Sequence, residues 1–434
     1  MKKILRYSLL IYLLSLPFSF PYVPKFLQGF SSDTSFLLFG VYLSDITGFI
    51  LLTLIAFHFY SYKNSFSHLK NFFASEKKIY LALFGFVFIS LLSFWWSGTP
   101  LFSFLLGFRM VMMTTLMFFV VYLLASSRKI KIKWLSLLAL LGVVQSVVGF
   151  WQVMLGKSLG LYLLGESQIS PEVLGLARFS FLGNDHLRAY GTLPHPNVLG
   201  GFLLLTISAT LVLRCWEKNK NNLNLALGVQ LFGLVLTFSR SALLGLIIIL
   251  ILNRKKIGEM IGLKIIKNKI LLISIAIISL AFLSRGPIMD TILLKSESSQ
   301  LRSEYLKANI DRFLTSPLLG RGFGTGPIEL PAFSNFSFYP WENQPVHNIF
   351  LLVLADLGIL GLGFFLFFIL KIFGKIKKAQ GESLIWGGLF LAYLFIGLFD
   401  HYLLTLPQGI FIFLFASLVF LATSKKVEKK SKEQ

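Results

Sequence analysis

Charged residues are scarce in this chain of 434 residues. Only 14% of the residues are Asp, Glu, Lys or Arg, whereas 55% are hydrophobic. Soluble domains carry roughly 25% charged residues, so this composition excludes an ordinary soluble protein. The sequence also lacks the segments of about ten alternating polar and apolar residues that are typical of membrane β-barrels. We therefore expect an all-α polytopic membrane protein.

Cysteine and carboxylates are scarce as well. Cys215 is the single cysteine, which excludes an intramolecular disulfide and a cysteine-based metal cluster. Asp and Glu number 19 against 41 Lys and Arg. The predicted external segments contain no cluster of carboxylates of the kind that holds a divalent cation. We expect neither a metal nor a cofactor.

Long hydrophobic runs are abundant. A helix needs about 20 apolar residues to cross about 30 Å of hydrocarbon. The first run follows the pattern of a signal peptide but has no small-residue cleavage site, so we interpret it as an uncleaved span. The pattern predicts about twelve spans, near residues 4–22, 36–59, 79–96, 101–125, 134–155, 196–213, 223–238, 241–252, 270–284, 346–370, 383–399 and 409–423.

The formal net charge of +22 raises the question of nucleic-acid binding. Most Lys and Arg residues fall in the connections that alternating spans place on the side of the N-terminus, including RKIKIK and the basic tail 424–434. This is the positive-inside distribution of membrane proteins. We predict one integral membrane domain over residues 1–434, in the bacterial cytoplasmic membrane with both termini in the cytoplasm. Its partner is the lipid bilayer and not a nucleic acid.

Residues 223–252 are almost continuously apolar and are interrupted only by Ser239-Arg240-Ser241. One long helix here would place the basic segment 253–269 on the external side, against the positive-inside rule. Two short spans joined at the interruption preserve that rule. Because both helices are short, their turn should lie below the membrane surface. Arg240 would then need a water-filled cavity or an anion, or it is an arginine that extends to the interface from a helix end.

Two external connections are long, residues 156–195 and 285–345, and long loops in compact proteins are usually functional. The second contains SSQLRSEYLKANIDRFLTSP, whose apolar spacing predicts an amphipathic helix on the outer membrane surface or over a cavity. A lid without chemistry fits the same pattern. GRGFGTG at 320–326 lacks the Lys-Ser/Thr of a phosphate-binding loop, so we interpret it as a tight turn.

Three ionisable residues lie deep in predicted spans, namely Asp45, Arg109 and Asp356. Charges at that depth are costly and face partners or functional cavities. We hypothesise that Arg109 pairs with Asp45 or with Asp356. The pairing can be purely structural, or the set can belong to a transporter or flippase.

Three stretches occur in a fixed order: RAYGTLPHPNVLGG at 188–201, TFSRSALLGL at 237–246 and VHNIFLLVLADLGILGLG at 346–363. PLLGRGFGTG precedes the third. Together these stretches resemble the O-antigen ligase and O-antigen polymerase (Wzy-type) superfamily of bacterial membrane glycosyltransferases. The resemblance covers residues 180–400 and does not separate ligases from polymerases.

The resemblance implies a C-type glycosyltransferase fold of about a dozen helices with its site on the outer face of the membrane. Such enzymes transfer a glycan from undecaprenyl pyrophosphate to a hydroxyl group of an acceptor glycan, lipid or protein, without a nucleotide sugar or, in the ligases, an obligatory metal.

The resemblance also implies roles for individual residues. Arg188 and Arg240 would hold the diphosphate, and His347 would orient or deprotonate the acceptor hydroxyl. Asp400 and His401 either contact acceptor sugars or form a helix-end pair. Further candidates for substrate binding are His195, Asn197, Asn348 and Arg109. His195 and Asn197 can instead shape their loop. Asn348 can instead cap its helix.

Overall fold

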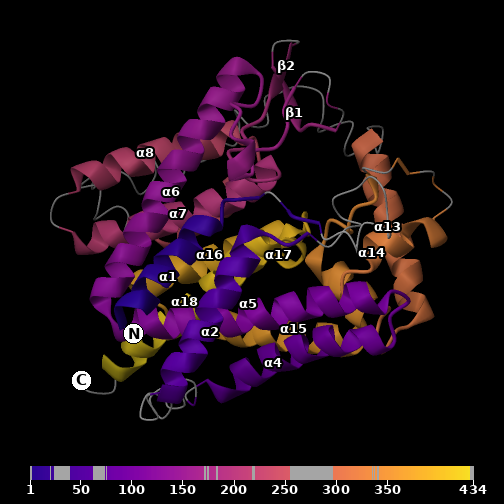
Figure 1. Cartoon of the computed structure of the whole chain (residues 1–434), viewed down its shortest axis with the longest axis horizontal. Helices are drawn as coiled ribbons and strands as arrows, with labels where there is room; N and C mark the ends of the chain where they lie inside the picture. Colours follow the sequence, from indigo (N-terminus) through magenta and orange to yellow (C-terminus); the bar gives the residue numbers. More distant parts are fainter. Residues whose placement is uncertain are drawn as a thin grey trace.

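The computed structural model is a bundle of helices with one small two-stranded sheet (Figure 1). It describes residues 2–19, 21–23, 40–61, 74, 76–170, 173, 175–181, 184–217, 220–254, 297–334, 336, 338–339 and 342–430. The sheet pairs β1 (Arg178–Phe181) with β2 (Asn184–Leu187) in antiparallel orientation. The α-helices are α1 (Lys2–Ser15), α2 (Leu43–Ser61), α4 (Lys77–Leu92), α5 (Pro100–Ser126), α6 (Arg128–Leu155), α7 (Pro196–Trp216), α8 (Asn221–Leu236), α9 (Arg240–Leu252), α13 (Glu297–Thr315), α14 (Gly326–Glu329), α15 (Ile349–Ile376), α16 (Glu382–Gly397), α17 (Tyr402–Thr405) and α18 (Pro407–Lys430).

The helices confirm an all-α polytopic membrane protein. Among the described residues, 7 helices are long and apolar enough to cross a membrane. Four shorter apolar helices accompany them, at Ile4–Ser15, Asn221–Leu236, Arg240–Leu252 and Glu382–Gly397. These helices overlap every predicted span except 270–284, which lies outside the described residues.

The centre of the bundle is formed by α7 and α18. In each of these two helices, 94% of the residues in the most apolar stretch are buried. Helix α7 packs against α6, α8, α9, α16 and α18, while α18 also packs against α5. A helix that is apolar all round is stable only when other helices surround it, which explains the central place of these two.

The predicted break in residues 223–252 is confirmed, because α8 ends at Leu236 and α9 begins at Arg240. In the turn between them, Phe238 has a φ of 46°, which is uncommon for a residue with a side chain. Such a conformation costs about 1–3 kcal/mol and persists only where surrounding contacts hold it. Here the Phe238 ring stacks on Phe179 of β1, with centroids 3.6 Å apart. The turn is therefore held by the loop that precedes α7.

Helix α15 is broken at Gly358, where φ is 65° and ψ is −167°. The sequence pattern predicted an uninterrupted span here, because hydrophobicity does not register a backbone break. GRGFGTG packs against the break: the Arg321 amide donates to Ala355 O at 3.1 Å and the Gly322 amide to Asp356 O at 2.9 Å. A Cβ atom on Gly320 or Gly358 would overlap the backbone of the other segment. The glycines thus form a tight turn for close packing.

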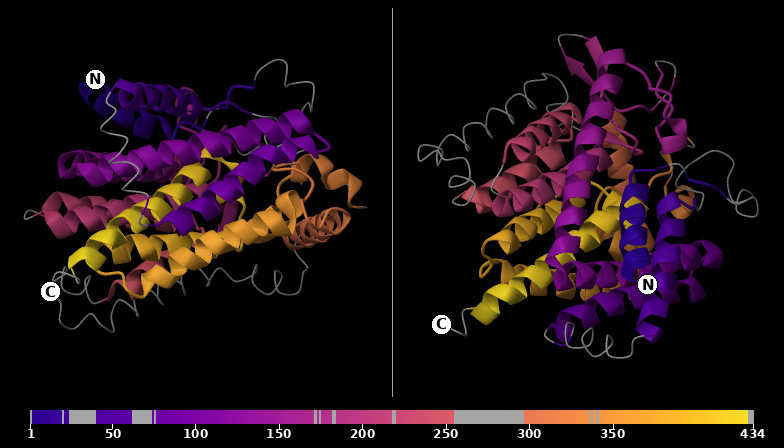
Figure 2. Two further views of the ribbon diagram at one scale, coloured as in Figure 1. Left: turned by 90° about the horizontal axis from the view of Figure 1, so that it is seen from below. Right: turned by 60° about the vertical axis from the view of Figure 1, so that its left-hand side comes forward.

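The predicted amphipathic helix is α13. Its Tyr305 and Ala308 are buried, whereas Leu306 and Ile310 on the neighbouring stripe are exposed. Figure 2 shows α13, in orange, at the end of the bundle opposite both chain termini. Helix α13 packs against α15.

Candidate functional site

A network of hydrogen bonds joins three segments of the protein at the start of α7. Arg188 donates from Nε to Thr237 O and from Nη2 to Asn197 Oδ1, both at 2.7 Å. Asn197 donates from Nδ2 to Asp400 Oδ2 at 2.8 Å. The end of the 156–195 loop is thereby fixed to the α8–α9 turn and to the segment after α16.

Three histidines surround this hydrogen-bond network. His195 is the N-cap of α7, and its Nδ1 accepts from the Asn197 amide at 3.1 Å, so the neutral ring carries its proton on Nε2. The rings of His347 and His401 meet edge to face, with centroids 5.1 Å apart. On its other side, His347 stacks on Tyr305 of α13, at 5.8 Å. Helix α13 and the α16–α18 connection therefore enclose His347.

His347 has the properties of a proton acceptor. Its Nδ1 is buried and has no hydrogen-bond partner among the described residues. Burial lowers the pKa of His347 below its ordinary value of 6.5 because the charged ring is poorly solvated. Burial likewise lowers the pKa of His195 to about 4. Both imidazoles are neutral at pH 7, and a neutral imidazole can accept a proton.

Positive charge converges on these histidines. Arg240, at the start of α9, is close enough to Arg188 for the two charges to repel, although burial is the main reason that the pKa of Arg188 is lowered to about 10. Arg302 of α13 is exposed, and its charge acts on both His195 and His347. Sequence reasoning missed Arg302, for which the one available signal was its position in the predicted amphipathic helix.

Asp400 is the carboxylate of this group. Burial raises the pKa of Asp400. Four neighbouring groups lower it, namely His401, His347, His195 and the Asn197 amide. The net result is a pKa below the ordinary value. Its Oδ1 also accepts from the His401 amide at 2.8 Å. We call Arg188, Arg240, Arg302, the three histidines, Asn197 and Asp400 the arginine–histidine cluster.

Asn348, a predicted site residue, caps a helix. Its Oδ1 accepts from the amides of Phe350 at 2.9 Å and Leu351 at 3.0 Å, the first turn of α15. Its Nδ2 donates to Leu398 O at 3.2 Å. Of the two alternatives for Asn348, the structure shows the cap, and no hydrogen bond joins it to His347.

Arg109 lies outside the cluster. It forms an ion pair with Asp45 at 2.8 Å and also bonds Gly40 O, so the hypothesised Arg109–Asp45 pair is confirmed. Arg109 lines a cavity of about 60 Å³ together with Val346 and Thr405, which adjoin His347 and His401. Its predicted contact with substrate would have to be made through this small cavity.

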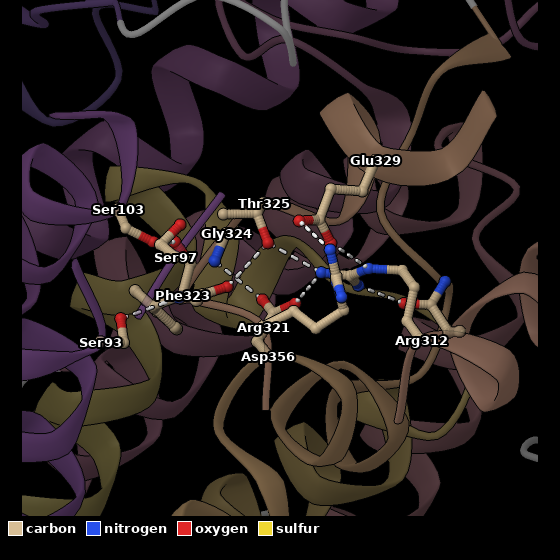
Figure 3. Close-up of polar contacts among 12 residues, drawn as sticks. Ser93, Ser97, Ser103, Arg312, Arg321, Phe323, Gly324, Thr325, Glu329 and Asp356 are labelled. Atoms are coloured by element: carbon tan, nitrogen blue, oxygen red, sulfur yellow. Dashed lines mark hydrogen bonds and ion pairs between the residues drawn. The ribbon is translucent and has the colours of Figure 1, made fainter. Parts of the chain in front are cut away.

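A second group of polar residues lies beneath the glycine turn (Figure 3). Arg312 is fully buried and pairs with Glu329 at 3.1 Å and with Asp356 at 3.0 Å. Arg321 shares Glu329 at 2.9 Å. We call this group, completed by Asn309 and Thr325, the Arg312 cluster. Asp356 is thus paired with Arg312 and not with Arg109.

The three ionisable residues predicted inside spans therefore belong to two ion pairs, and Arg109 and Asp356 line the same cavity. Within the described ranges, no group of three or more His, Cys, Asp or Glu residues is placed to hold a metal ion.

The model of the O-antigen ligase family (Wzy_C) matches residues 225–366. No curated protein matches the chain. The matched segment contains Arg240, Arg302 and His347, whereas Arg188 and Asp400 join them through the fold. The match confirms the resemblance stated from the sequence. This chain is a polytopic membrane protein, and its residues 225–366 are similar to the O-antigen ligase family.

Proposed function

We propose that this protein transfers a glycan from undecaprenyl pyrophosphate to an acceptor hydroxyl at the outer face of the cytoplasmic membrane. The gathering of Arg188, Arg240 and Arg302 in one cluster with the neutral His347 carries this proposal. A site for this reaction needs positive charge for a pyrophosphate leaving group and a base for the acceptor hydroxyl, and the cluster offers both.

The arginines are suited to the leaving group. Among the residues that the structure describes, Arg188 bonds two neutral acceptors, Thr237 O and Asn197 Oδ1, and no carboxylate directly. Guanidinium groups bind phosphate oxygens with two parallel hydrogen bonds. Stabilising the charge that develops on a leaving group is the largest electrostatic task of such a reaction.

His347 is the base in this proposal. The acceptor O–H proton passes to the imidazole, the acceptor oxygen bonds to the anomeric carbon, and the bond from that carbon to the pyrophosphate oxygen breaks. The electron pair of the broken bond stays on the pyrophosphate, which the arginines hold. Asp400, whose charge acts on His347, stabilises the imidazolium that forms.

The test is glycan analysis of a strain that lacks the protein and is complemented with His347→Ala, Arg240→Ala or a matched control, Lys307→Ala. Lys307 lies on α13 with a side chain that is 67% exposed. We expect the two site variants to accumulate in the membrane normally yet to lose transfer, while the control retains it. Transfer retained in both site variants would refute the assignment.

The same strain distinguishes ligase from polymerase. Accumulation of full-length polymer on its lipid carrier would identify a ligase. Loss of the ladder of chain lengths would identify a polymerase.

A further inference from the structure

A second cavity lies far from the arginine–histidine cluster. It has a volume of about 470 Å³ and is lined by α5, α6, α7, α16 and α18. Helix α7 begins beside Asn197 in the cluster and ends at Trp216 in the cavity wall. A helix of 21 residues is about 30 Å long, which equals the hydrocarbon thickness of a bilayer. The cavity therefore lies at the opposite membrane face, and we call it the opposite-face cavity.

One wall of the opposite-face cavity is positively charged. Lys131 Nζ lies 2.9 Å from Glu382 Oε1 and 4.9 Å from the centre of the Trp216 ring. The guanidinium carbon of Arg128 lies 5.9 Å from the same ring. The Lys131 side chain is only 12% exposed, so its position is held by these contacts. Arg128 and Lys131 therefore bring two cations to this wall, together with the carboxylate of Glu382.

The same wall contains two polar atoms without partners. Trp386 Nε1 and Glu382 Oε2 are buried and have no hydrogen-bond partner among the described residues. Trp386 is fully buried, and both residues line the cavity. A buried polar group without a partner costs about 1–3 kcal/mol, so a donor and an acceptor left together in one wall favour a ligand that satisfies both.

The rest of the cavity is apolar. A small phosphate ion would satisfy the polar wall and leave this surface in contact with water, whereas an amphiphile would cover both. A volume of about 470 Å³ falls in the usual range for ligand pockets of about 300–1,000 Å³. The apolar lining comes chiefly from α5 and α18, with Val121, Leu124, Ala125, Phe415, Val419 and Ala422.

We propose that the opposite-face cavity binds a phospholipid whose headgroup carries a phosphate and an N–H donor, as in phosphatidylethanolamine. The phosphate contacts Arg128 and Lys131, and the ammonium group donates to Glu382 Oε2. Trp386 Nε1 donates to a phosphate or ester oxygen, and the upper part of one acyl chain covers the apolar wall. The site is separate from the proposed transferase chemistry and does not depend on it.

The test places the full chain in phosphatidylcholine nanodiscs that contain a photoactivatable phosphatidylethanolamine, and maps the labelled peptides by mass spectrometry. We expect labelling of the α16 and α18 segments. Unlabelled phosphatidylethanolamine should compete at least tenfold better than phosphatidylcholine, whose trimethylated nitrogen has no hydrogen to donate to Glu382.

The double variant Arg128→Ala/Lys131→Ala should reduce this labelling at least tenfold. Its matched control is Lys129→Ala/Lys133→Ala, which removes the same charge from the same turn but from side chains that line a different cavity. A second variant, Ala422→Phe, keeps every charge and fills the cavity, and it should also reduce labelling. Because Ala422→Phe removes no charged side chain, it distinguishes labelling that is lost with the cavity from labelling that is lost because the protein does not fold.

Equal labelling in the Arg128/Lys131 variant and its control would overturn the proposal, because the lipid would then be part of the general lipid annulus. Unchanged labelling in Ala422→Phe would overturn it as well. Competition by millimolar inorganic phosphate would assign the site to a free anion and exclude a lipid headgroup.

Discussion

Two groups of arginines lie at the same end of this molecule and differ in how their charge is balanced. In the Arg312 cluster, two carboxylates pair directly with Arg312, and Arg321 shares one of them. In the arginine–histidine cluster, Arg188 bonds an amide oxygen and a backbone carbonyl, while Asp400 is reached only through Asn197. The first group is neutralised within the protein, whereas the second presents positive charge beside neutral imidazoles.

This difference separates a structural role from a role in binding. A fully buried arginine that pairs with carboxylates holds two segments together, here α13 and the break in α15. Arg188 and Arg240 are close enough for their charges to repel, and an anion between them relieves that repulsion. Substitutions should therefore reduce stability in the Arg312 cluster and reduce activity in the arginine–histidine cluster.

The largest expected effect follows Arg312→Ala. The change leaves Asp356 buried without its cation and Glu329 with Arg321 alone, and breaking a buried pair costs about 3–5 kcal/mol. Thermal unfolding of the purified protein in detergent should show this loss. Arg321→Gln is the control: its side chain is 31% exposed, and we expect an effect of about 1 kcal/mol or less. Similar melting of Arg312→Ala and wild type would contradict the structural role.

Arg302→Gln should show the opposite behaviour. Arg302 is exposed, and the described residues provide it with no ion pair, so its removal should leave the melting temperature unchanged. The loss of one charge that stabilises the leaving group should lower the transfer rate on the order of 10²-fold. Paired measurements of melting and transfer test this. A variant that transfers at the wild-type rate would remove Arg302 from the site.

The pH profile reports the state of His347. Because burial lowers the pKa of His347, the base form persists at pH 7, and the transfer rate should fall only below about pH 6.5. Asp400 raises this pKa, so Asp400→Asn should move the acid limb to still lower pH. An acid limb that does not move in Asp400→Asn would contradict the electrostatic role of the carboxylate.

The stability of the protein changes in the same pH range as the transfer rate, and both decrease as the pH falls. The folded His195 and His347 bind fewer protons than the unfolded chain, so the free energy of unfolding decreases as pH falls below about 6.5. Melting must therefore be measured at each pH, so that a loss of folded protein is not read as a loss of base.

Asn348→Ala should have the smallest effect. It removes a helix cap that accepts two backbone amides, which costs about 0.5–2 kcal/mol of stability. The transfer rate of the remaining folded protein should stay within a few-fold of wild type, and Asn348→Ser should restore the stability. A large loss of transfer at full stability would show that Asn348 acts on His347 or on substrate.

Much of this arrangement could be predicted from local sequence. The positive-inside distribution predicted the break at Arg240, and helical spacing predicted α13. The partners of Asp356 could not be predicted, because Arg312 is 44 residues away and its burial depends on how the glycine turn packs into the break of α15. Arg302 was missed for the same reason: an exposed arginine on an external helix looks ordinary until the fold brings α13 against His347.

Binding of undecaprenyl pyrophosphate to the purified full chain is the most direct test of the arginine–histidine cluster. We expect the diphosphate to bind at least tenfold more tightly than undecaprenyl monophosphate, and this preference to disappear in Arg302→Gln and persist in Arg321→Gln. Equal affinity for the two lipids in the wild-type protein, or an unchanged preference in Arg302→Gln, would contradict the claim that the arginine–histidine cluster holds the pyrophosphate.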